Sequence, residues 1–329
     1  MVGLVTDAPL LKVRDLAIQY GKGVSLMKQV GFSVQRGETV GLVGESGCGK
    51  SLTALAVMGL MAQNLHISEG GIELDGVDLV QMSDVDLRKL RGERMAMIFQ
   101  EPMTALNPVM TVGAQVVEVL RAHRRMTRAE AARRAVELLE LVRLPDAAAR
   151  FSDYPHRLSG GMRQRVVIAI AIACSPALLI ADEPTTALDV TVQAQILQLL
   201  KRLQRDANLG LLFITHDLGV VRQIADRIVV MYAGSVVEEG PVDAVLDNPR
   251  HPYTTGLLAA RPHGSFIEDG HRLADIKGTV PAPHARPAGC PFEPRCVNAR
   301  TDCRQSPPPR TAFNGDRALR CYHPASSLN

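Results

Sequence analysis

The segment Gly44-Glu45-Ser46-Gly47-Cys48-Gly49-Lys50-Ser51 constrains the fold of this chain more than any other. It lies between an apolar run at 39–43, which predicts a strand, and residues 52–60, which predict a helix. Glycines at this spacing let backbone N–H groups close around phosphate oxygens at the start of a helix. In this pattern Lys50 reaches the outer phosphates and the Ser51 hydroxyl ligates magnesium. The segment therefore predicts a phosphate site in a strand–loop–helix unit.

A second apolar run, at 178–181, ends in the carboxylates Asp182 and Glu183. A buried strand has no packing reason to end in two acidic residues. We therefore predict that Asp182 holds magnesium and that Glu183 polarises an attacking water as a general base. A role as a helix cap could account for one of these carboxylates but not for the pair.

Short apolar runs at 39–43, 95–99, 178–181 and 211–214 alternate with helical segments from Leu10 to about residue 247. This alternation is typical of an α/β core built on a largely parallel sheet.

Between residues 102 and 158 the strand pattern disappears. Thr127 and Glu130 form a capping box there, and apolar residues follow at helical spacing, namely Ala132, Val136, Leu139 and Val142. We therefore predict an inserted helical subdomain at about 102–158, within a domain that spans residues 1–247.

The composition excludes several classes of protein. The chain carries 37 basic and 34 acidic residues, so its net charge of +3 indicates no nucleic-acid partner. Its N-terminus lacks the pattern of a secretory signal, and we expect no export. Ser175 and Pro176 divide the longest apolar stretch, residues 166–181, into pieces too short to span a membrane. Any membrane association is therefore expected to come through partner subunits.

A second glycine-rich helix start, Leu158-Ser159-Gly160-Gly161-Met162-Arg163-Gln164-Arg165, offers another anion site. With this segment, essentially the whole chain resembles the ABC transporter ATPases, although Met162 stands where Gln is more usual. The resemblance implies an α/β P-loop NTPase (RecA-like) core with an antiparallel β subdomain and a helical subdomain. It also implies that Ser159, Gly160 and Gly161 bind ATP held by an opposite subunit in a head-to-tail pair. One chain alone should then hydrolyse ATP poorly.

Four further residues take roles from this resemblance. Gln100 senses magnesium and water, His216 contacts the terminal phosphate, Asp189 contributes to the nucleotide site, and Tyr20 stacks on adenine. For Tyr20, a place in the hydrophobic core is the alternative. Cys48 is expected to fill space within the phosphate loop, and Cys174 to be a buried small hydrophobe.

The tail at 248–329 differs in composition from the rest of the chain, because 12 of the 20 prolines and four of the six cysteines lie in it. We predict a compact, irregular module. Cysteines separated by five, six and seventeen residues in a segment with few hydrophobic residues suggest metal ligation that holds the module together. These cysteines are Cys290, Cys296, Cys303 and Cys321.

Residues 251–258 and 290–296 resemble the C-terminal extension of dipeptide and oligopeptide permease ATPases. The resemblance favours a [4Fe-4S] cluster on the four cysteines, while Zn²⁺ remains open and free thiols or disulfides fit a reducing cytosol less well. His323 is a candidate substitute ligand, with a surface histidine as the default.

The resemblance implies an ATP-hydrolysing subunit of an importer of dipeptides or oligopeptides. Its partners would be a second, homologous ABC ATPase, two transmembrane permease subunits and an extracytoplasmic solute-binding protein, with the chain at the cytoplasmic face of the inner membrane. Nickel or glutathione as solute, and a soluble ABC ATPase without transport, are the alternatives. A metal-binding module with a vestigial ATP site is disfavoured, because Lys50, Asp182, Glu183 and His216 are all present. A small-molecule kinase would not need a second glycine-rich helix start.

Overall fold

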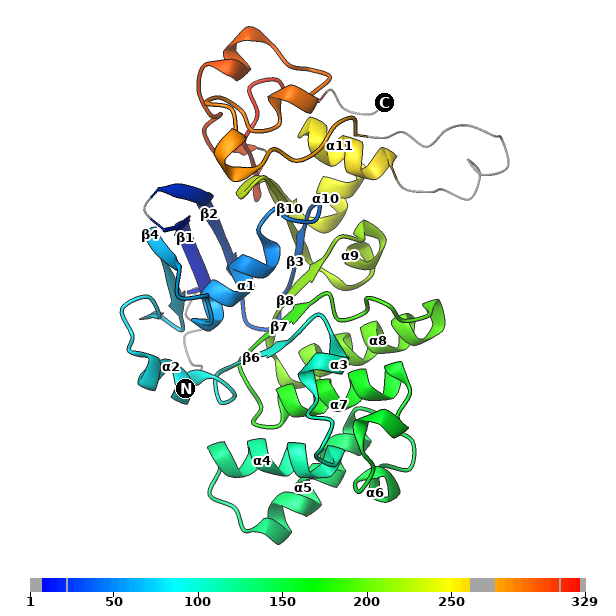
Figure 1. Ribbon diagram of the computed structural model, residues 1–329. Helices are drawn as coiled ribbons and strands as arrows, with labels where there is room; N and C mark the ends of the chain where they lie inside the picture. Colours follow the sequence, from blue (N-terminus) through cyan, green and yellow to red (C-terminus); the bar gives the residue numbers. More distant parts are fainter. Residues whose placement is uncertain (1–7, 22, 261–275, 314, 326–329) are drawn as a thin grey trace, which may run out of the picture.

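The computed structural model describes residues 8–21, 23–260, 276–313 and 315–325, with residues 102 and 103 described by backbone alone. Residues 1–7, part of the N-terminus from which we expect no secretory signal, lie outside these ranges. In the described residues an eight-stranded sheet runs through the middle of the molecule (Figure 1), in the order β11-β12-β10-β9-β3-β8-β7-β6. Its strands are β3 (Thr39–Val43), β6 (Met95–Ile98), β7 (Leu178–Asp182), β8 (Gly210–Thr215), β9 (Arg227–Tyr232), β10 (Ser235–Pro241), β11 (Thr311–Phe313) and β12 (Arg317–Leu319).

The strands β6, β7, β8, β3 and β9 pair in parallel, each with the next. Every residue of β3, β7 and β8 is buried, because helices or a second sheet cover both faces. The four strands predicted from the sequence are thereby confirmed to within one residue at each end. Since the strands are parallel, the loops that follow them meet at one edge of the sheet.

A four-stranded antiparallel sheet packs on one face of the parallel strands, which confirms the predicted antiparallel β subdomain. Its order is β2-β1-β4-β5. Helix α1 (Lys50–Met58) lies between the two sheets and shares a core with them, which includes Ile180, Leu212 and Ile214 of the parallel strands. The strands of this sheet are β1 (Leu11–Tyr20), β2 (Val24–Val34), β4 (Leu65–Leu74) and β5 (Val77–Asp78), followed by α2 (Asp84–Leu90).

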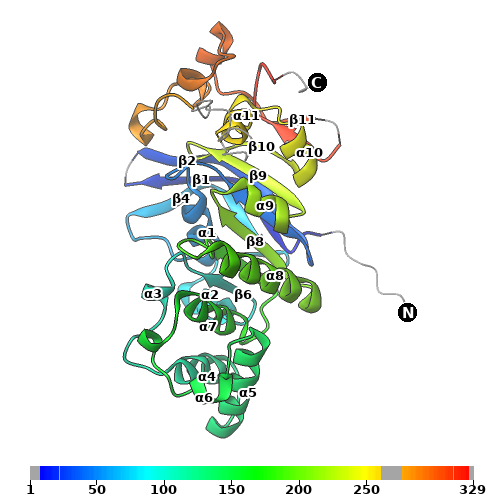
Figure 2. The ribbon, with the colours of Figure 1, turned by 90° about the vertical axis from the view of Figure 1, so that its right-hand side faces the viewer.

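Helices cover the opposite face, because alternate strand residues point there. Leu179, Leu211 and Phe213 pack in a second core with α7 (Gly160–Ile172) and α8 (Val190–Ala207). Figure 2 shows α8 and α9 (Leu218–Ile224) in front of the sheet from this side. The long apolar stretch is split as expected, since α7 ends at Ile172 and β7 begins at Leu178.

Between β6 and α7 the described backbone contains helices and no strand, namely α3 (Pro102–Ala105), α4 (Val112–His123), α5 (Arg128–Leu141), α6 (Ala147–Arg150) and the 3₁₀ turn η1 (Pro155–Arg157). The capping box is confirmed: the Thr127 hydroxyl accepts a bond from the Glu130 N–H at 3.3 Å, and the Glu130 carboxylate accepts one from the Thr127 N–H at 2.8 Å.

The buried face of α5 is rotated from the predicted one. Ala131, Ala135 and Leu138 are buried, whereas Ala132 and Val136 are only partly buried. Leu139 and Val142 are buried as predicted, and this face of α5 packs against α4 and α7.

After α10 (Val242–Asp247) and α11 (Pro252–Ala259), the chain forms 3₁₀ turns joined by irregular backbone. These turns are η2 (Pro283–Ala285), η3 (Glu293–Arg295) and η4 (Thr301–Arg304). The sequence did not predict the hairpin of β11 and β12, which joins the main sheet through pairing of β12 with β10. In the described part of the chain, no helix is both long and apolar enough to cross a membrane.

Buried carboxylates on β10 fasten this tail to the sheet. Glu238 is 1% exposed and accepts bonds from the His251 N–H at 3.0 Å and the Arg317 guanidinium at 2.7 Å. Its neighbour Glu239 accepts a bond from Arg310 Nε at 2.8 Å. Charge pairing therefore crosses from the tail into the main sheet.

Candidate functional site

The phosphate loop connects β3 to α1 and takes a backbone form that requires glycine. Gly44, Gly47 and Gly49 have φ of +149°, +77° and +108°, values that other residues rarely adopt. A Cβ on Gly44 would lie 2.2 Å from the Met231 carbonyl oxygen, so no larger residue fits there. The pocket beside the loop is also lined by residues of other loops.

Lys50 is 5% exposed and folds back over the loop. Its Nζ donates to the carbonyl oxygens of Gly44 at 2.8 Å and Glu45 at 3.1 Å. Cys48 lies beneath it, and burial raises the pKa of this thiol, which agrees with a space-filling role. A phosphate entering the loop can take over the hydrogen bonds of Lys50 without a large movement of the backbone.

Three side chains from successive parallel strands meet beside this loop. Glu183 follows β7, and its carboxylate accepts a bond from Gln100 Nε2 at 3.3 Å, from the loop after β6. His216, which follows β8, has Nδ1 3.2 Å from the other Glu183 oxygen. These residues are more than 30 positions apart in sequence, and the shared edge of the parallel sheet brings them together.

The surroundings of Glu183 favour its charged form. Burial raises the pKa of this carboxyl, but hydrogen bonds from His216 and Thr186 and the charge of Lys50 outweigh burial and lower it overall. Glu183 is therefore a carboxylate at neutral pH, as a general base must be.

Asp182 is 4% exposed, and its Oδ1 has no hydrogen-bond partner. Burial raises the pKa of this carboxyl, while a hydrogen bond with Ser51 lowers it. An unpaired buried carboxylate oxygen is costly unless a cation or a water satisfies it. The carboxylate and the Ser51 hydroxyl are hard oxygen ligands of the kind that Mg²⁺ prefers, so the residues present fit that ion.

The second glycine-rich start lies elsewhere in the chain. The Ser159 hydroxyl caps α7 by accepting the Met162 N–H at 3.4 Å, and Asp189 caps α8 by accepting the Val192 N–H at 2.9 Å. Ser159 and Gly161 line a pocket that shares no residue with the phosphate pocket. Figure 1 shows α7 and α1 in different parts of the molecule. One chain therefore does not bring the two loops together.

Tyr20 ends β1 and is 50% exposed, so it is not part of the hydrophobic core. It does not line the phosphate pocket in this chain. An exposed ring at a strand end is available for stacking on a planar ligand, and adenine stacking remains a prediction.

The C-terminal tail adds residues that the sequence did not assign to this site. Pro283 and Arg286 line the phosphate pocket, and Arg295 and Tyr253 contact Glu45 of the loop. Tyr253 and Arg295 carried a signal, since they belong to the segments 251–258 and 290–296 that resemble the permease extension, whereas Pro283 and Arg286 carried none.

The four tail cysteines line one small pocket. Burial, together with the neighbouring thiols, raises the pKa of Cys290 to about 11 and that of Cys321 to about 12. Ionising several thiols side by side therefore requires a compensating positive charge, as a metal provides.

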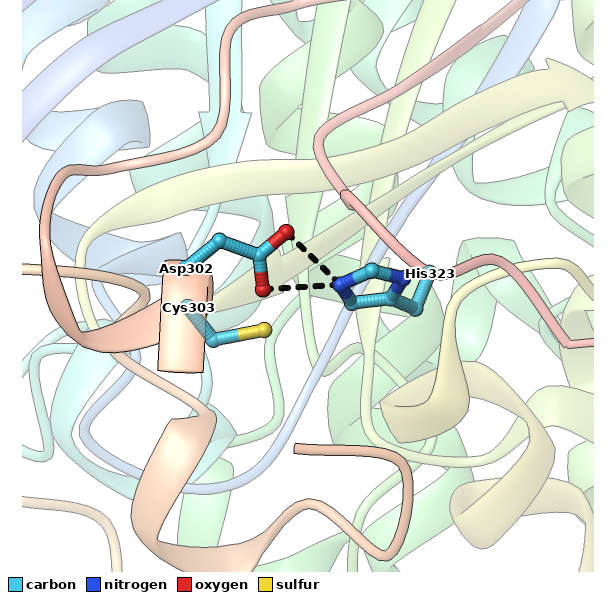
Figure 3. A group of neighbouring side chains, drawn as sticks. All are labelled: Asp302, Cys303 and His323. Carbon is cyan, nitrogen blue, oxygen red and sulfur yellow. Dashed lines mark hydrogen bonds and ion pairs between the residues drawn. The ribbon is translucent and has the colours of Figure 1, made fainter. Parts of the chain in front are cut away.

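His323 is not a surface histidine, which corrects the default expectation, since its side chain is 22% exposed and lies in this pocket. Its Nε2 is 2.8 Å from both carboxylate oxygens of Asp302 (Figure 3). Among the described residues, Asp302, Cys303 and His323 are the group of potential metal ligands whose ligand atoms lie within 4.8 Å of one another.

Comparison with known proteins identifies the family. Residues 27–186 match the model of the ABC transporter family, and residues 237–303 match the oligopeptide/dipeptide transporter C-terminal region. The chain is 50% identical over 317 residues to a putative peptide import ATP-binding protein of Brucella abortus (strain 2308), covering 95% of each chain. This chain belongs to the ABC transporter ATPases. It is also 52% identical to the oligopeptide transport ATP-binding protein AppD of Bacillus subtilis (strain 168), over 95% of this chain and 96% of that protein.

Solved structures of ABC ATPases share the fold. The ATP-binding cassette MJ0796, in a dimeric post-hydrolysis state bound to ADP and phosphate, matches with a TM-score of 0.63 and 32% identity, over 70% of this chain and 98% of that one. CbiO1 of Clostridium perfringens, part of the ABC transporter complex CbiONQ, matches with a TM-score of 0.63 and 26% identity, over 73% and 91%. This ABC ATPase is thus an ATP-binding, ATP-hydrolysing protein with a P-loop NTPase fold.

Proposed function

We propose that this ABC ATPase powers the import of dipeptides or oligopeptides through partner permease subunits. The match of residues 237–303 to the oligopeptide/dipeptide transporter C-terminal region carries this proposal. It is supported by the two relatives at about 50% identity, which are named for peptide import and oligopeptide transport.

The roles proposed for the core residues follow from their positions. Backbone N–H groups of residues 44–51 surround the phosphates, and Lys50 exchanges its carbonyl partners for phosphate oxygens. Ser51 and Asp182 hold Mg²⁺, which offsets phosphate charge when bound, with Gln100 beside them. Glu183 accepts a proton from water.

His216 has a second proposed role at this edge. It contacts the terminal phosphate and orients the Glu183 carboxylate, which lies 3.2 Å from its Nδ1. The hydrogen bond at Nδ1 leaves Nε2 of the ring to face the phosphate. The His216 side chain is 63% exposed, so a ligand can reach it.

We further propose that two ABC ATPases pair head to tail, so that Ser159, Gly160, Gly161 and Asp189 of each complete the ATP site of the other. The separation of the two pockets within one chain and the dimeric state of MJ0796 support this pairing. The partner would be a homologous ATPase. Two permease subunits and an extracytoplasmic solute-binding protein would complete the importer, with this chain at the cytoplasmic face of the membrane.

The four tail cysteines are proposed to hold a [4Fe-4S] cluster. A single tetrahedral zinc with Zn–S bonds of about 2.3 Å would bring four sulfurs to about 3.8 Å from one another. The thiols line one pocket but do not form a group within 4.8 Å, a spacing that favours a larger centre. Elemental and sulfide analysis of protein purified without oxygen tests this assignment. Four irons and four sulfides per chain are expected, whereas one zinc would contradict it.

Transport itself tests the main proposal. The chain would be reconstituted in proteoliposomes with its permease subunits, its partner ATPase and its solute-binding protein, and uptake of a labelled dipeptide would be followed. ATP-dependent uptake that Lys50→Ala abolishes is expected. Uptake of nickel or glutathione in place of peptide would overturn the substrate class, and ATP hydrolysis without any permease partner would indicate a soluble ABC ATPase.

A further inference from the structure

One ion pair, between Arg295 and Glu45, joins the C-terminal tail to the phosphate loop. Arg295 donates from Nη1 to Glu45 Oε2 at 2.6 Å and from Nη2 to Glu45 Oε1 at 3.0 Å. Two parallel bonds between a guanidinium and a carboxylate fix direction as well as distance. The pair joins residues 250 positions apart, and Glu45 immediately follows the first glycine of the loop.

The guanidinium of Arg295 is itself held on every side. Its Nε donates to the Lys277 carbonyl oxygen and its Nη2 to that of Ile276, both at 3.0 Å. The group lies over the Tyr232 ring, 5.7 Å from the ring centre, and the side chain is 5% exposed. The side chain of Arg295 is therefore fixed in position and is not a mobile surface charge.

Glu45 is also held through its backbone. Its N–H donates to the Tyr253 hydroxyl at 2.8 Å, and its carbonyl oxygen accepts one of the two carbonyl-directed bonds of Lys50. The Tyr253 ring is fully buried against Tyr232 and Phe292. Side chain, amide and carbonyl of Glu45 thus all have fixed partners, and two of these partners come from the tail.

We propose that Arg295 is a positioning residue for ATP: it holds Glu45 so that the phosphate loop is preformed for the nucleotide. This rests on the proposed role of the loop in binding ATP. A preformed loop loses less conformational freedom when phosphate binds, which lowers the dissociation constant. The chemical step depends on Glu183 and His216, which Arg295 does not contact.

Equilibrium binding of MgATP to the full chain tests the proposal, with hydrolysis prevented by a non-hydrolysable analogue. Arg295→Gln and Glu45→Ala are each expected to weaken binding by about tenfold, a typical coupling between linked sites. The double variant should bind about as weakly as either single variant, because both remove the same contact. Arg300→Gln, an exposed arginine of the same tail, serves as the matched control and should bind like the unmodified chain.

In the assembled complex the same variants should raise KM for ATP and leave kcat nearly unchanged, a split that a general loss of structure would not produce. If Arg295→Gln fails to fold, Glu45→Ala carries the test, since it leaves the tail sequence intact. Unchanged ATP affinity in a folded Arg295→Gln or Glu45→Ala variant would overturn the proposal, as would strictly additive losses in the double variant. Failure of the unmodified chain to bind the analogue would instead refute the proposed nucleotide site.

Discussion

The nucleotide-binding core and the C-terminal tail are held by different forces. In the core, β3, β7 and β8 are buried along their whole length among aliphatic side chains. Among residues 276–313 and 315–325 the buried hydrophobic side chains are few, namely Phe292, Cys303, Ala318 and Leu319. The tail is attached by arginine–carboxylate pairs to Glu45, Glu238 and Glu239, and by the aromatic contacts of Tyr253 and Phe292 with Tyr232. The core can thus form from local apolar patterns, whereas the tail needs particular partners far away in the sequence.

The largest expected effect is on ATP hydrolysis, which should depend on the residues at the edge of the parallel sheet in the core. Glu183→Gln should lower kcat in the assembled complex by about 10²–10⁴-fold, the usual contribution of a general base, with ATP affinity little changed. Glu140→Gln, an exposed glutamate on α5, provides the matched control. Steady-state ATPase assays measure the effect, and wild-type turnover by Glu183→Gln would place catalysis elsewhere.

Substitutions in the two regions should lower the free energy of unfolding by different mechanisms. Glu238→Ala leaves Arg317 unpaired in the interior, and loss of one partner of a buried ion pair costs about 3–5 kcal/mol. Phe213→Ala in the core should cost about the same through cavity formation. Limited proteolysis should then cut the tail of Glu238→Ala while the core stays intact, but open the core of Phe213→Ala.

The exposed Glu69→Ala is the control for both substitutions, with an expected change within about 0.5 kcal/mol. Equal loss of core and tail protection in Glu238→Ala would mean that the two regions unfold as one unit.

Removal of metal from the tail is the next test, because a metal would supply what the tail lacks in apolar contacts. A chelator is expected to raise amide hydrogen exchange at 276–325 and to leave the strands of the core protected. ATP affinity should fall by no more than it does in Arg295→Gln, since that arginine directly precedes Cys296. Unchanged exchange in the tail would show that the cysteines do not stabilise it.

The smallest expected effect is a dependence of tail stability on acid. His251 is 1% exposed, and burial lowers its pKa from 6.5 to about 3. The unfolded chain therefore binds a proton first as the pH falls. The contribution of neutral His251 to the free energy of unfolding is complete above about pH 6.5. It declines below that pH by up to about 1.4 kcal/mol per pH unit.

His251→Asn keeps a cap for the N–H of Tyr253 and removes the titrating ring. Thermal unfolding of this variant between pH 5 and 7 should show a shallower pH dependence than the original chain. His284→Asn, at an exposed position, is the control and should retain the steeper dependence.

The same contrast explains what the sequence could predict. The strands and the phosphate loop were predictable because each depends on a local pattern. Glu183 was predicted because two carboxylates end an apolar strand, and His216 because the chain resembles the ABC transporter ATPases. The parallel strands bring these two residues to one edge of the sheet. Residue spacing also identified the capping box of α5.

The contacts of the tail were not predictable in this way. Arg295 and Glu45 have no periodic relation, and any of the 37 basic residues could have paired with this carboxylate. The hairpin of β11 and β12 was missed because strands of three residues carry too little alternation to be seen. The rotated face of α5 was missed because alanine is compatible with either face.

The pairing of β12 with β10 also bears on solubility. Without β12, the seven-residue strand β10 would be the last strand on its side of the sheet, with its backbone groups free to pair with another molecule. The strand that takes the outer position, β11, has three residues and follows Pro307, Pro308 and Pro309, which cannot donate backbone hydrogen bonds. Truncation before this hairpin should therefore promote self-association of the protein through the exposed edge of its sheet.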